Sequence, residues 1–423
     1  MFKFLHAADL HLDSPLKGLE RYDGAPVDEI RGATRRALQN LVAVAIEQQV
    51  QFVLIAGDVY DGDWKDHNTG LFFVSQMSRL RAADIPVVVI SGNHDAANKM
   101  TKSLPLPDNV EWLSHTKAVS SKSKILADLG VAVHGRSFAK AAEMENLARL
   151  YPERKKELFN IGLLHTSLNG AAGHEPYAPC EVAELQQKEY DYWALGHVHT
   201  RQVKLEHPWI VYPGNIQGRQ IRETGAKGCY LVTVDDHGTT SLEFQPLDVF
   251  RWEVCRVDVA GLTTGDDLLE QVSSGLSRLL TAHPDLPLAV RIQIVGESTL
   301  HDRLLAEPVN WTNDLRAAAL DDSNGRIWLE KVEFRTTPPQ SSDRAARDDG
   351  PIGELLQFFH ELQEDDTALQ ELNSELDDLR RKLPEELLTG DQGLAFSSPE
   401  QRRALIEEIR PFLLNRLLKG NDR

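Results

Sequence analysis

The sequence predicts an α/β fold, a two-sheet β-sandwich flanked by helices, and three observations support this prediction. Short apolar runs alternate with amphipathic helical patterns over residues 1–90, as in parallel strands joined by helices. Later apolar runs are short and closely spaced, as in a second sheet. Asp, Asn and His residues follow directly after the ends of several runs. We therefore expect one site at the carboxyl ends of the strands.

The N-terminal segment supplies the alternating part of the pattern. It predicts a strand at Phe2–Ala8, a helix at about Asp28–Gln49, a strand from Phe52, a helix at Leu71–Arg81 and a strand at Ile85–Ile90. The first helix is predicted because apolar residues recur there at spacings of three and four. Four consecutive apolar residues at Phe52–Ile55 are typical of a strand that is buried on both faces.

Strand patterns dominate the rest of the predicted sandwich. They cover Ile125–Val133, Phe159–His165, Tyr192–Gly196, Trp209–Tyr212 and Gly228–Val234. The histidine-bearing strand ends stop between residues 240 and 250, and a smaller α/β unit follows. Its predicted strands are Trp252–Val259, Leu288–Val295 and Ile327–Phe334, separated by helices at Asp266–Leu280 and Leu300–Leu305.

This organisation predicts three structured regions and a linker. The sandwich domain covers residues 1–245, and a small α/β capping domain covers residues 246–338. Residues 339–350, which contain Pro, Ser, Asp and Gly, are interpreted as a linker. The sequence predicts a helical C-terminal region at residues 351–423, with leucines in a seven-residue pattern between Leu362 and Leu383. These helices either pack within the chain or dock a partner.

Composition sets a few limits on location and ligands. The chain has 423 residues, 41% apolar residues and a net charge of -18 at pH 7. Most of the negative charge lies beyond residue 240, so it does not exclude DNA as a ligand of the N-terminal domain. No apolar run reaches about eighteen residues, so we expect no membrane-spanning segment. Three cysteines without metal-ligand spacing, and no recognisable signal peptide, favour a cytoplasmic location.

Five polar segments follow predicted strands in order along the chain. They are Asp9-x-His11, Gly57-Asp58-x-x-Asp61, Gly92-Asn93-His94-Asp95, His165 and Gly196-His197-x-His199. Each one alone has an ordinary structural explanation, because Asp caps helices, Gly-Asn favours turns and a lone buried His is usually a hydrogen-bonded core residue. Five segments that each place a ligand-type residue directly after a strand favour a shared metal site instead.

The residue types of this set suit divalent first-row metals. A mixture of Asp, Asn and His is typical of such ions, and the absence of cysteine ligands disfavours a structural zinc site. Asp58 ends a buried strand, where its charge is costly without compensation, and a carboxylate is the side chain that best bridges two ions. Two bridged ions would polarise a phosphoryl oxygen and lower the pKa of a bound water.

These motifs resemble those of the calcineurin-like metallophosphoesterases. Within that superfamily the sequence is similar to the bacterial DNA repair exonucleases of the SbcD type, and most similar to the YhaO-type branch. The matching segments are His6–Pro15, Ala56–Asp61, Ser91–Asp95, Leu164–Ser167, Asp191–His199 and the loop Tyr212–Asn215. They lie within residues 1–220, and the second domain matches only in its position and α/β pattern.

The resemblance implies a role for each member of the set. One metal ion would be held by Asp9, His11, Asp58 and His199. The other would be held by Asp58, Asn93, His165 and His197, so that Asp58 bridges the two ions. His94 would be a catalytic residue that stabilises the transition state or protonates the leaving group. Asp95 is a second catalytic candidate, which either orients the His94 ring or caps a turn. Asp61 stands where some relatives carry a histidine that positions substrate.

The function implied is a Mn²⁺-dependent DNA exonuclease of DNA repair, with single-strand endonuclease activity as a further option. Two alternatives stay open: a phosphatase or small-molecule phosphodiesterase with the same metal centre, and a scaffold subunit that docks an ATPase partner. In the resembling family the C-terminal helices bind the base of the coiled coil of an SbcC-like ATPase subunit. DNA, such an ATPase and a second copy of the chain are therefore the candidate partners, and no membrane contact is expected.

A group of basic residues follows the last metal motif. It comprises Arg201, Lys204, Arg219, Arg222 and Lys227. These side chains either contact a phosphate backbone or form a solvated loop face, and the pattern does not separate the two.

Overall fold

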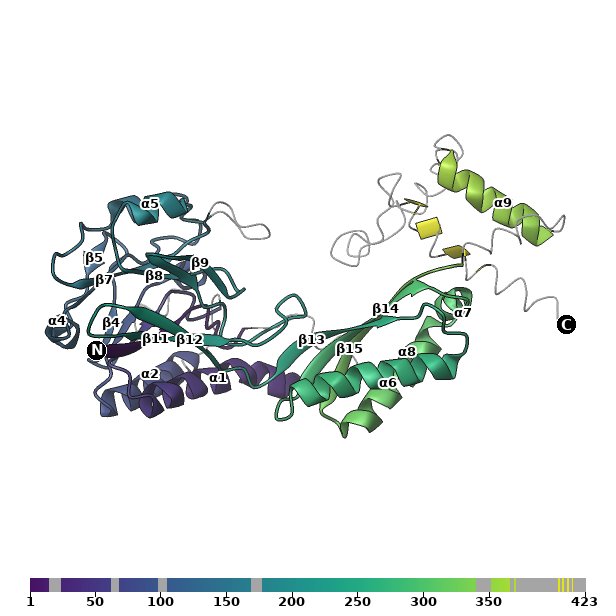
Figure 1. Cartoon of the computed structure of the whole chain (residues 1–423), viewed down its shortest axis with the longest axis horizontal. Coiled ribbons are helices and arrows are strands. Elements are labelled where there is room, and N and C mark those ends of the chain that lie inside the picture. Colours follow the sequence, from purple (N-terminus) through teal and green to yellow (C-terminus); the bar gives the residue numbers. More distant parts are fainter. Residues whose placement is uncertain are drawn as a thin grey trace. The chain divides into compact units, whose positions relative to one another are not determined.

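The computed structural model describes residues 1–14, 24–61, 68–97, 105–168, 177–339 and 351–365, and residues 369, 402, 403, 405, 406, 409, 410 and 413. The chain separates into two compact units, Met1–Glu253 with Asp285–Ala289, and Val254–Pro284 with Val290–Arg423 (Figure 1). The predicted linker beyond residue 339 and the leucine pattern beyond Leu369 lie outside the described residues.

Two six-stranded sheets form the first unit in the described part of the chain. The first has the order β12-β11-β1-β2-β3-β4, with β1 (Phe2–Ala7), β2 (Phe52–Ile55), β3 (Val87–Val89), β4 (Val110–Trp112), β11 (Gly228–Val234) and β12 (Thr240–Pro246). The second has the order β5-β6-β7-β8-β10-β9, with β5 (Val119–Ser120), β6 (Val131–Gly135), β7 (Phe159–His165), β8 (Tyr192–Gly196), β9 (Gln202–Glu206) and β10 (Trp209–Tyr212).

Parallel pairing brings the ends of the central strands together. Strands β1 to β4 are parallel, as are β6, β7, β8 and β10. The predicted α/β class with a two-sheet sandwich is therefore confirmed, and within each sheet the carboxyl ends of the central strands share one edge.

The apolar run of β2 is divided between the two faces of its sheet. Phe52 and Leu54 belong to the core between the two sheets, which also contains Ile161 and Leu163 of β7. Val53 and Ile55 belong to the core on the other face, with residues of α1 (Val27–Glu47) and α2 (Asn68–Ala82). Figure 1 shows these two helices beside the sheet. Both faces are buried, which explains why the strand is continuously apolar.

The strand predicted at Ile125–Val133 is wrong in its first half. Residues Lys124–Asp128 form helix α4, and the Ser123 side chain caps that helix by accepting a hydrogen bond from the backbone N of Leu126. Gly130, at φ +73°, then ends the helical segment before β6 begins. The serine cap and the glycine favour a helix here, although the apolar pattern predicts a strand. Other short helices of this unit are α3 (Asn93–Ala97), α5 (Val182–Gln186) and a 3₁₀ helix at Leu147–Leu150.

The second unit contains a three-stranded sheet of order β13-β14-β15, with β13 (Arg251–Asp258), β14 (Leu288–Glu297) and β15 (Ile327–Thr337). Helices α6 (Gly265–Ala282) and α8 (Pro308–Ser323) lie side by side along it, and α7 (His301–Ala306) precedes α8 (Figure 1). The sequence pattern did not predict α8, because only a narrow stripe of it is buried, at Trp311, Leu315 and Ala319.

Helix α9 (Pro351–Glu364) belongs to the predicted C-terminal helical region. Its residues Phe359 and Leu362 pack with Leu369 and Ile406 in a small apolar cluster. None of the helices in the described part of the chain has the length and hydropathy needed to cross a membrane.

Candidate metal centre

All the predicted site residues lie where the parallel strands of the two sheets end. Asp9 and His11 follow β1, Asp58 follows β2, and Asn93 begins α3 after β3. From the second sheet, His165 ends β7, and His197 and His199 follow β8. Backbone hydrogen bonds join these loops: the Asp9 N–H donates to Gly57 O at 3.0 Å, and the His11 N–H donates to Asp58 O at 3.0 Å.

The backbone of these loops is strained at the predicted ligands. Asp9, His11, Asp58 and His197 have φ angles of 52°, 43°, 51° and 100°. Non-glycine residues rarely adopt positive φ, and each such residue costs on the order of 1–3 kcal/mol. Four of them at one sheet edge indicate that the loops are shaped for the position of their side chains.

Glycines beside these residues allow a very close approach. A Cβ atom on Gly92 would lie 2.3 Å from Oδ1 of Asp58, and one on Gly57 would lie 2.5 Å from Nδ1 of His165. A Cβ atom on Gly196 would lie 2.0 Å from the carbonyl oxygen of Ala56. A side chain at any of these three glycines would collide with a neighbouring atom, so glycine is needed at each position for the strand ends to approach this closely.

Carboxylate and imidazole groups converge in three overlapping sets, whose ligand atoms lie within 4.8 Å of one another. The sets are Asp9, His11 and His199; Asp9, Asp58 and His165; and His11, Asp58 and His94. Asp9, His11 and Asp58 each belong to two of them, so the sets overlap at two carboxylates, and a carboxylate is the group that can bridge two ions. The remaining predicted ligands lie beside these sets, since Asn93 Oδ1 is 3.1 Å from Nε2 of His165 and the His197 ring centroid is 5.2 Å from that of His165.

The donor atoms fit a cation better than they fit one another. Nε2 of His11 faces Nε2 of His199 at 3.1 Å, a contact that needs either a proton on one of the two nitrogens or a bound cation. Nδ1 of His11 is buried and has no hydrogen-bond partner among the described residues, with the nearest carboxylate oxygen, Asp61 Oδ1, 3.9 Å away. These residues therefore fit divalent metal ions, which bind neutral imidazole and carboxylate.

The electrostatics of the site also call for positive charge. Burial raises the pKa of Asp9 to about 6, although His165 and His199 oppose the rise. Burial acts in the same direction on Asp58, but His165 and His94 hold its pKa below the ordinary value. Burial lowers the pKa of His165, but Asp58 and Asp9 raise it to about 9. The buried carboxylates thus draw a proton onto His165, and bound divalent cations would supply that charge instead.

Asp61, and not Asp95, contacts the ring of His94. Nδ1 of His94 lies 2.7 Å from Oδ1 of Asp61, and this contact raises the pKa of His94 against the opposing effect of burial. Asp95 accepts hydrogen bonds from the backbone N–H groups of Val59, Tyr60 and Gly92. Asp95 therefore holds the loop that carries Asp58, which corresponds to the capping alternative for this residue.

Two of the predicted basic residues lie in the site rather than on a solvated face. Arg219 donates from Nη1 to Oδ2 of Asp61 at 3.1 Å, and its side chain is only 14% exposed. Lys227 is buried and donates to the carbonyl oxygen of His199 at 3.0 Å. Arg201 instead stacks on the ring of Phe244, and Lys204 is exposed.

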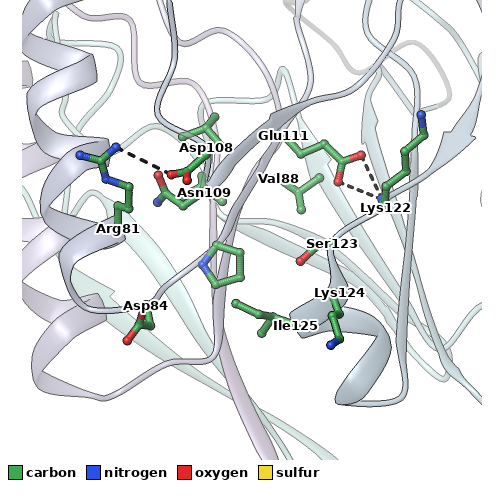
Figure 2. A pocket seen from close by; sticks show the side chains of 13 residues that line it. Arg81, Asp84, Val88, Asp108, Asn109, Glu111, Lys122, Ser123, Lys124 and Ile125 are labelled. Atoms are coloured by element: carbon green, nitrogen blue, oxygen red, sulfur yellow. Dashed lines mark hydrogen bonds and ion pairs between the residues drawn. The ribbon is translucent and has the colours of Figure 1, made fainter.

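A second concave region lies elsewhere on the first unit (Figure 2). It is lined by residues at the starts of β3 and β4 and by Lys122, Ser123 and Lys124, away from the strand ends that carry the predicted ligands. Arg81 faces Asp108 at 3.8 Å, and Glu111 accepts from the backbone N–H of Lys122 (Figure 2). Because these charged groups pair locally and do not converge, this region is not the candidate site.

Comparisons with known proteins agree with this geometry. The family model of calcineurin-like phosphoesterases matches residues 2–201, so the first unit contains a calcineurin-like phosphoesterase domain. The model of the middle domain of the metallophosphoesterase YhaO matches residues 252–337. YhaO of Bacillus subtilis is 34% identical over 421 residues, which are 99% of this chain and 98% of that protein. The chain therefore belongs to the YhaO family of metallophosphoesterases.

Two more distant similarities cover part of the chain. The DNA double-strand break repair protein Mre11 of Sulfurisphaera tokodaii is 29% identical over 206 residues, which are 48% of this chain and 50% of that protein. The structure of a dimetal phosphatase from Danio rerio aligns with 56% of this chain and 93% of that chain, at 12% identity and a TM-score of 0.33.

Proposed function

We propose that the protein is a metal-dependent nuclease that hydrolyses DNA phosphodiesters in DNA repair. The observation that carries the proposal is the convergence of Asp9, His11, Asp58, His165 and His199, with the His94–Asp61 pair directly beside them. Metal ions held by Asp9, His11, Asp58, Asn93, His165, His197 and His199 would supply Lewis acidity and an activated water. Mn²⁺ is the proposed metal, because a mixed carboxylate and imidazole set suits it.

His94 is the proposed general acid of the reaction. Its side chain is 38% exposed, unlike the buried His11 and His165, so it can reach a substrate. The Asp61 carboxylate holds the proton on Nδ1 of His94 and orients the ring. Arg219 balances the charge of Asp61 and lies close enough to favour an anionic phosphate at the same place.

The choice of DNA as substrate rests on the partial similarity to Mre11, over 206 residues, and on the concentration of negative charge outside the sandwich domain. The three cysteines are buried free thiols, which supports a reducing, cytoplasmic location. A phosphatase or small-molecule phosphodiesterase is the alternative, since the same ligands would serve it.

Parallel hydrolysis assays separate these substrates. The purified full chain would be given end-labelled duplex DNA, single-stranded DNA and a cyclic nucleotide, with Mn²⁺, Mg²⁺ or EDTA. We expect cleavage of DNA with Mn²⁺ and none with EDTA. Hydrolysis of the cyclic nucleotide alone would exclude the nuclease, and hydrolysis of none of the three would contradict the proposal as a whole.

We also propose that residues 351–423 dock an SbcC-like ATPase subunit. Phe358, Ile409 and Leu413 support this, because these apolar side chains are 48%, 41% and 36% exposed. Removing residues 351–423 should abolish capture of that ATPase while hydrolysis continues. Undiminished capture by the shortened chain would contradict the docking proposal.

A further inference from the structure

Glu223 is a buried carboxylate outside the predicted ligand set that contacts one of the predicted ligands. It is 6% exposed. Oε1 accepts from Nδ1 of His199 at 2.8 Å and from Nη2 of Arg219 at 3.4 Å. Oε2 accepts from Nδ2 of Asn215 at 2.8 Å and from the backbone N–H of Arg219 at 2.8 Å. Both oxygens therefore face only donors.

The contact with Glu223 fixes which nitrogen of His199 carries the proton. An ionised carboxylate only accepts hydrogen bonds, so the proton must be on Nδ1 of His199. Nη2 of Arg219 is also 3.4 Å from that nitrogen, but it donates to the carboxylate because Nδ1 already carries a hydrogen. Nε2 is then the nitrogen without a proton, and it faces Nε2 of His11 at 3.1 Å. An imidazole nitrogen binds a metal only in this form.

The ring of His165 depends less on a side chain. Nδ1 of His165 is 2.8 Å from the carbonyl oxygen of Ala56, so the backbone fixes that ring. His165 and His11 are also fully buried, whereas the side chain of His199 is 21% exposed. His199 also has the shorter carboxylate contact, 2.8 Å to Glu223, against 3.5 Å between His165 and Asp58.

We propose that Glu223 is a positioning residue of the metal centre, which holds His199 in the tautomer that binds metal through Nε2. Asn215 and Arg219 in turn hold Glu223, which gives the loop that starts at Tyr212 a role in metal binding. The inference rests on the proposed metal centre and adds to it a residue that does not contact the ions.

Mn²⁺ titration calorimetry on the EDTA-treated full chain tests this role. In Glu223→Gln an amide NH₂ group would take the place of one carboxylate oxygen. At either oxygen position this group would face hydrogen-bond donors, so Gln cannot make the contacts of the carboxylate. We expect the affinity for Mn²⁺ at one of the two metal sites to fall by roughly 10–100-fold. Such a loss is typical when a residue that hydrogen-bonds to a metal ligand is removed. Glu206→Gln, which removes the same charge from an exposed position on β9, should bind Mn²⁺ like the wild type. Unchanged affinity in Glu223→Gln overturns the proposal.

A second measurement needs no variant of Glu223. Long-range ¹H–¹⁵N spectra of the metal-free wild type, with His199 assigned by its absence in His199→Gln, report the tautomer directly. We expect the proton on Nδ1, and a proton on Nε2 overturns the inference. A wild type that binds no Mn²⁺ contradicts the proposed function, while the spectra still decide the contact between Glu223 and His199.

Discussion

His94 and Asp61 form a pair whose protonation follows from their surroundings. Burial opposes charge on both, but the hydrogen bond between them raises the pKa of His94 and lowers that of Asp61. Ser14 and Arg219 also stabilise the Asp61 charge. The pair therefore keeps an imidazolium beside a carboxylate to a higher pH than a free histidine would, and this is the form that a general acid needs.

Replacing Asp61 by Asn should move the pH dependence of hydrolysis. In the proposed mechanism the protonated form of His94 is the active one, so activity should be lost as pH rises through its pKa. Without the Asp61 charge this pKa falls, so the basic limb of the kcat profile should move to lower pH. The loss of kcat should stay within the about 10²–10⁴-fold that general acid–base catalysis supplies.

Mn²⁺ content provides the control for that variant, because Asp61 is not among the proposed ligands. If Asp61→Asn keeps both the wild-type basic limb and the wild-type kcat, His94 is not the general acid that Asp61 supports.

At the scale of single residues, the sequence could predict the candidate ligands that the fold brings together but not their hydrogen-bond partners. Asp9, Asp58 and His165 could be found because each follows an apolar run directly. Arg219 and Asp61 are 158 positions apart, and Glu223 and His199 are 24 apart, so no local pattern connects them. No spacing in the sequence points to Glu223, because its contact with His199 exists only once the chain is folded.

At the scale of elements, the site depends on the contact between the end of β8 and the loop after β2. The Cα atom of Gly196 lies so close to the Ala56 carbonyl that a Cβ atom would be 2.0 Å from that oxygen. Backbone atoms cannot rotate away as a side chain can. The two sheets are therefore held in register at the point where their ligands meet.

Gly196→Ala should destabilise the first unit and weaken Mn²⁺ binding together. Overpacking of this kind costs about 1–3 kcal/mol, measurable as a lower urea midpoint. Gly32→Ala is a matched control, since in helix α1 its Cβ would meet only Nη1 of Arg36 at 3.4 Å. That variant should be stabilised by up to about 1 kcal/mol. Equal midpoints for Gly196→Ala and the wild type would contradict the close contact.

Helices and strands could be predicted where burial of a face produces a regular pattern of apolar residues along the chain. Strands β7, β8, β10 and β11 are found at the predicted residues because their apolar runs are bounded by turns and polar ends. Helix α8 was missed because few of its residues are buried, and α4 replaced a predicted strand because Ser123 caps a helix there. A capping residue, or a helix with few buried residues, changes the pattern of apolar residues only slightly, so the pattern does not reveal such a helix.

At the scale of the whole molecule, every proposed catalytic and metal-binding residue comes from the first unit, between Asp9 and His199. The excess of negative charge lies in the other half of the sequence. The proposed site residues and the excess of acidic residues thus lie in different parts of the chain. The net charge of -18 therefore does not describe the part that would contact DNA.

The most direct test is the Mn²⁺-dependent cleavage of end-labelled duplex DNA by the wild type and Asp58→Asn, measured side by side at equal folded concentration. In the proposed centre Asp58 bridges the two ions, and the amide of Asn lacks the charge that the two ions would share. We predict cleavage by the wild type and a loss in Asp58→Asn greater than the roughly 10–100-fold typical of residues outside the ligand set. Equal cleavage by the two proteins would contradict a metal centre bridged by Asp58.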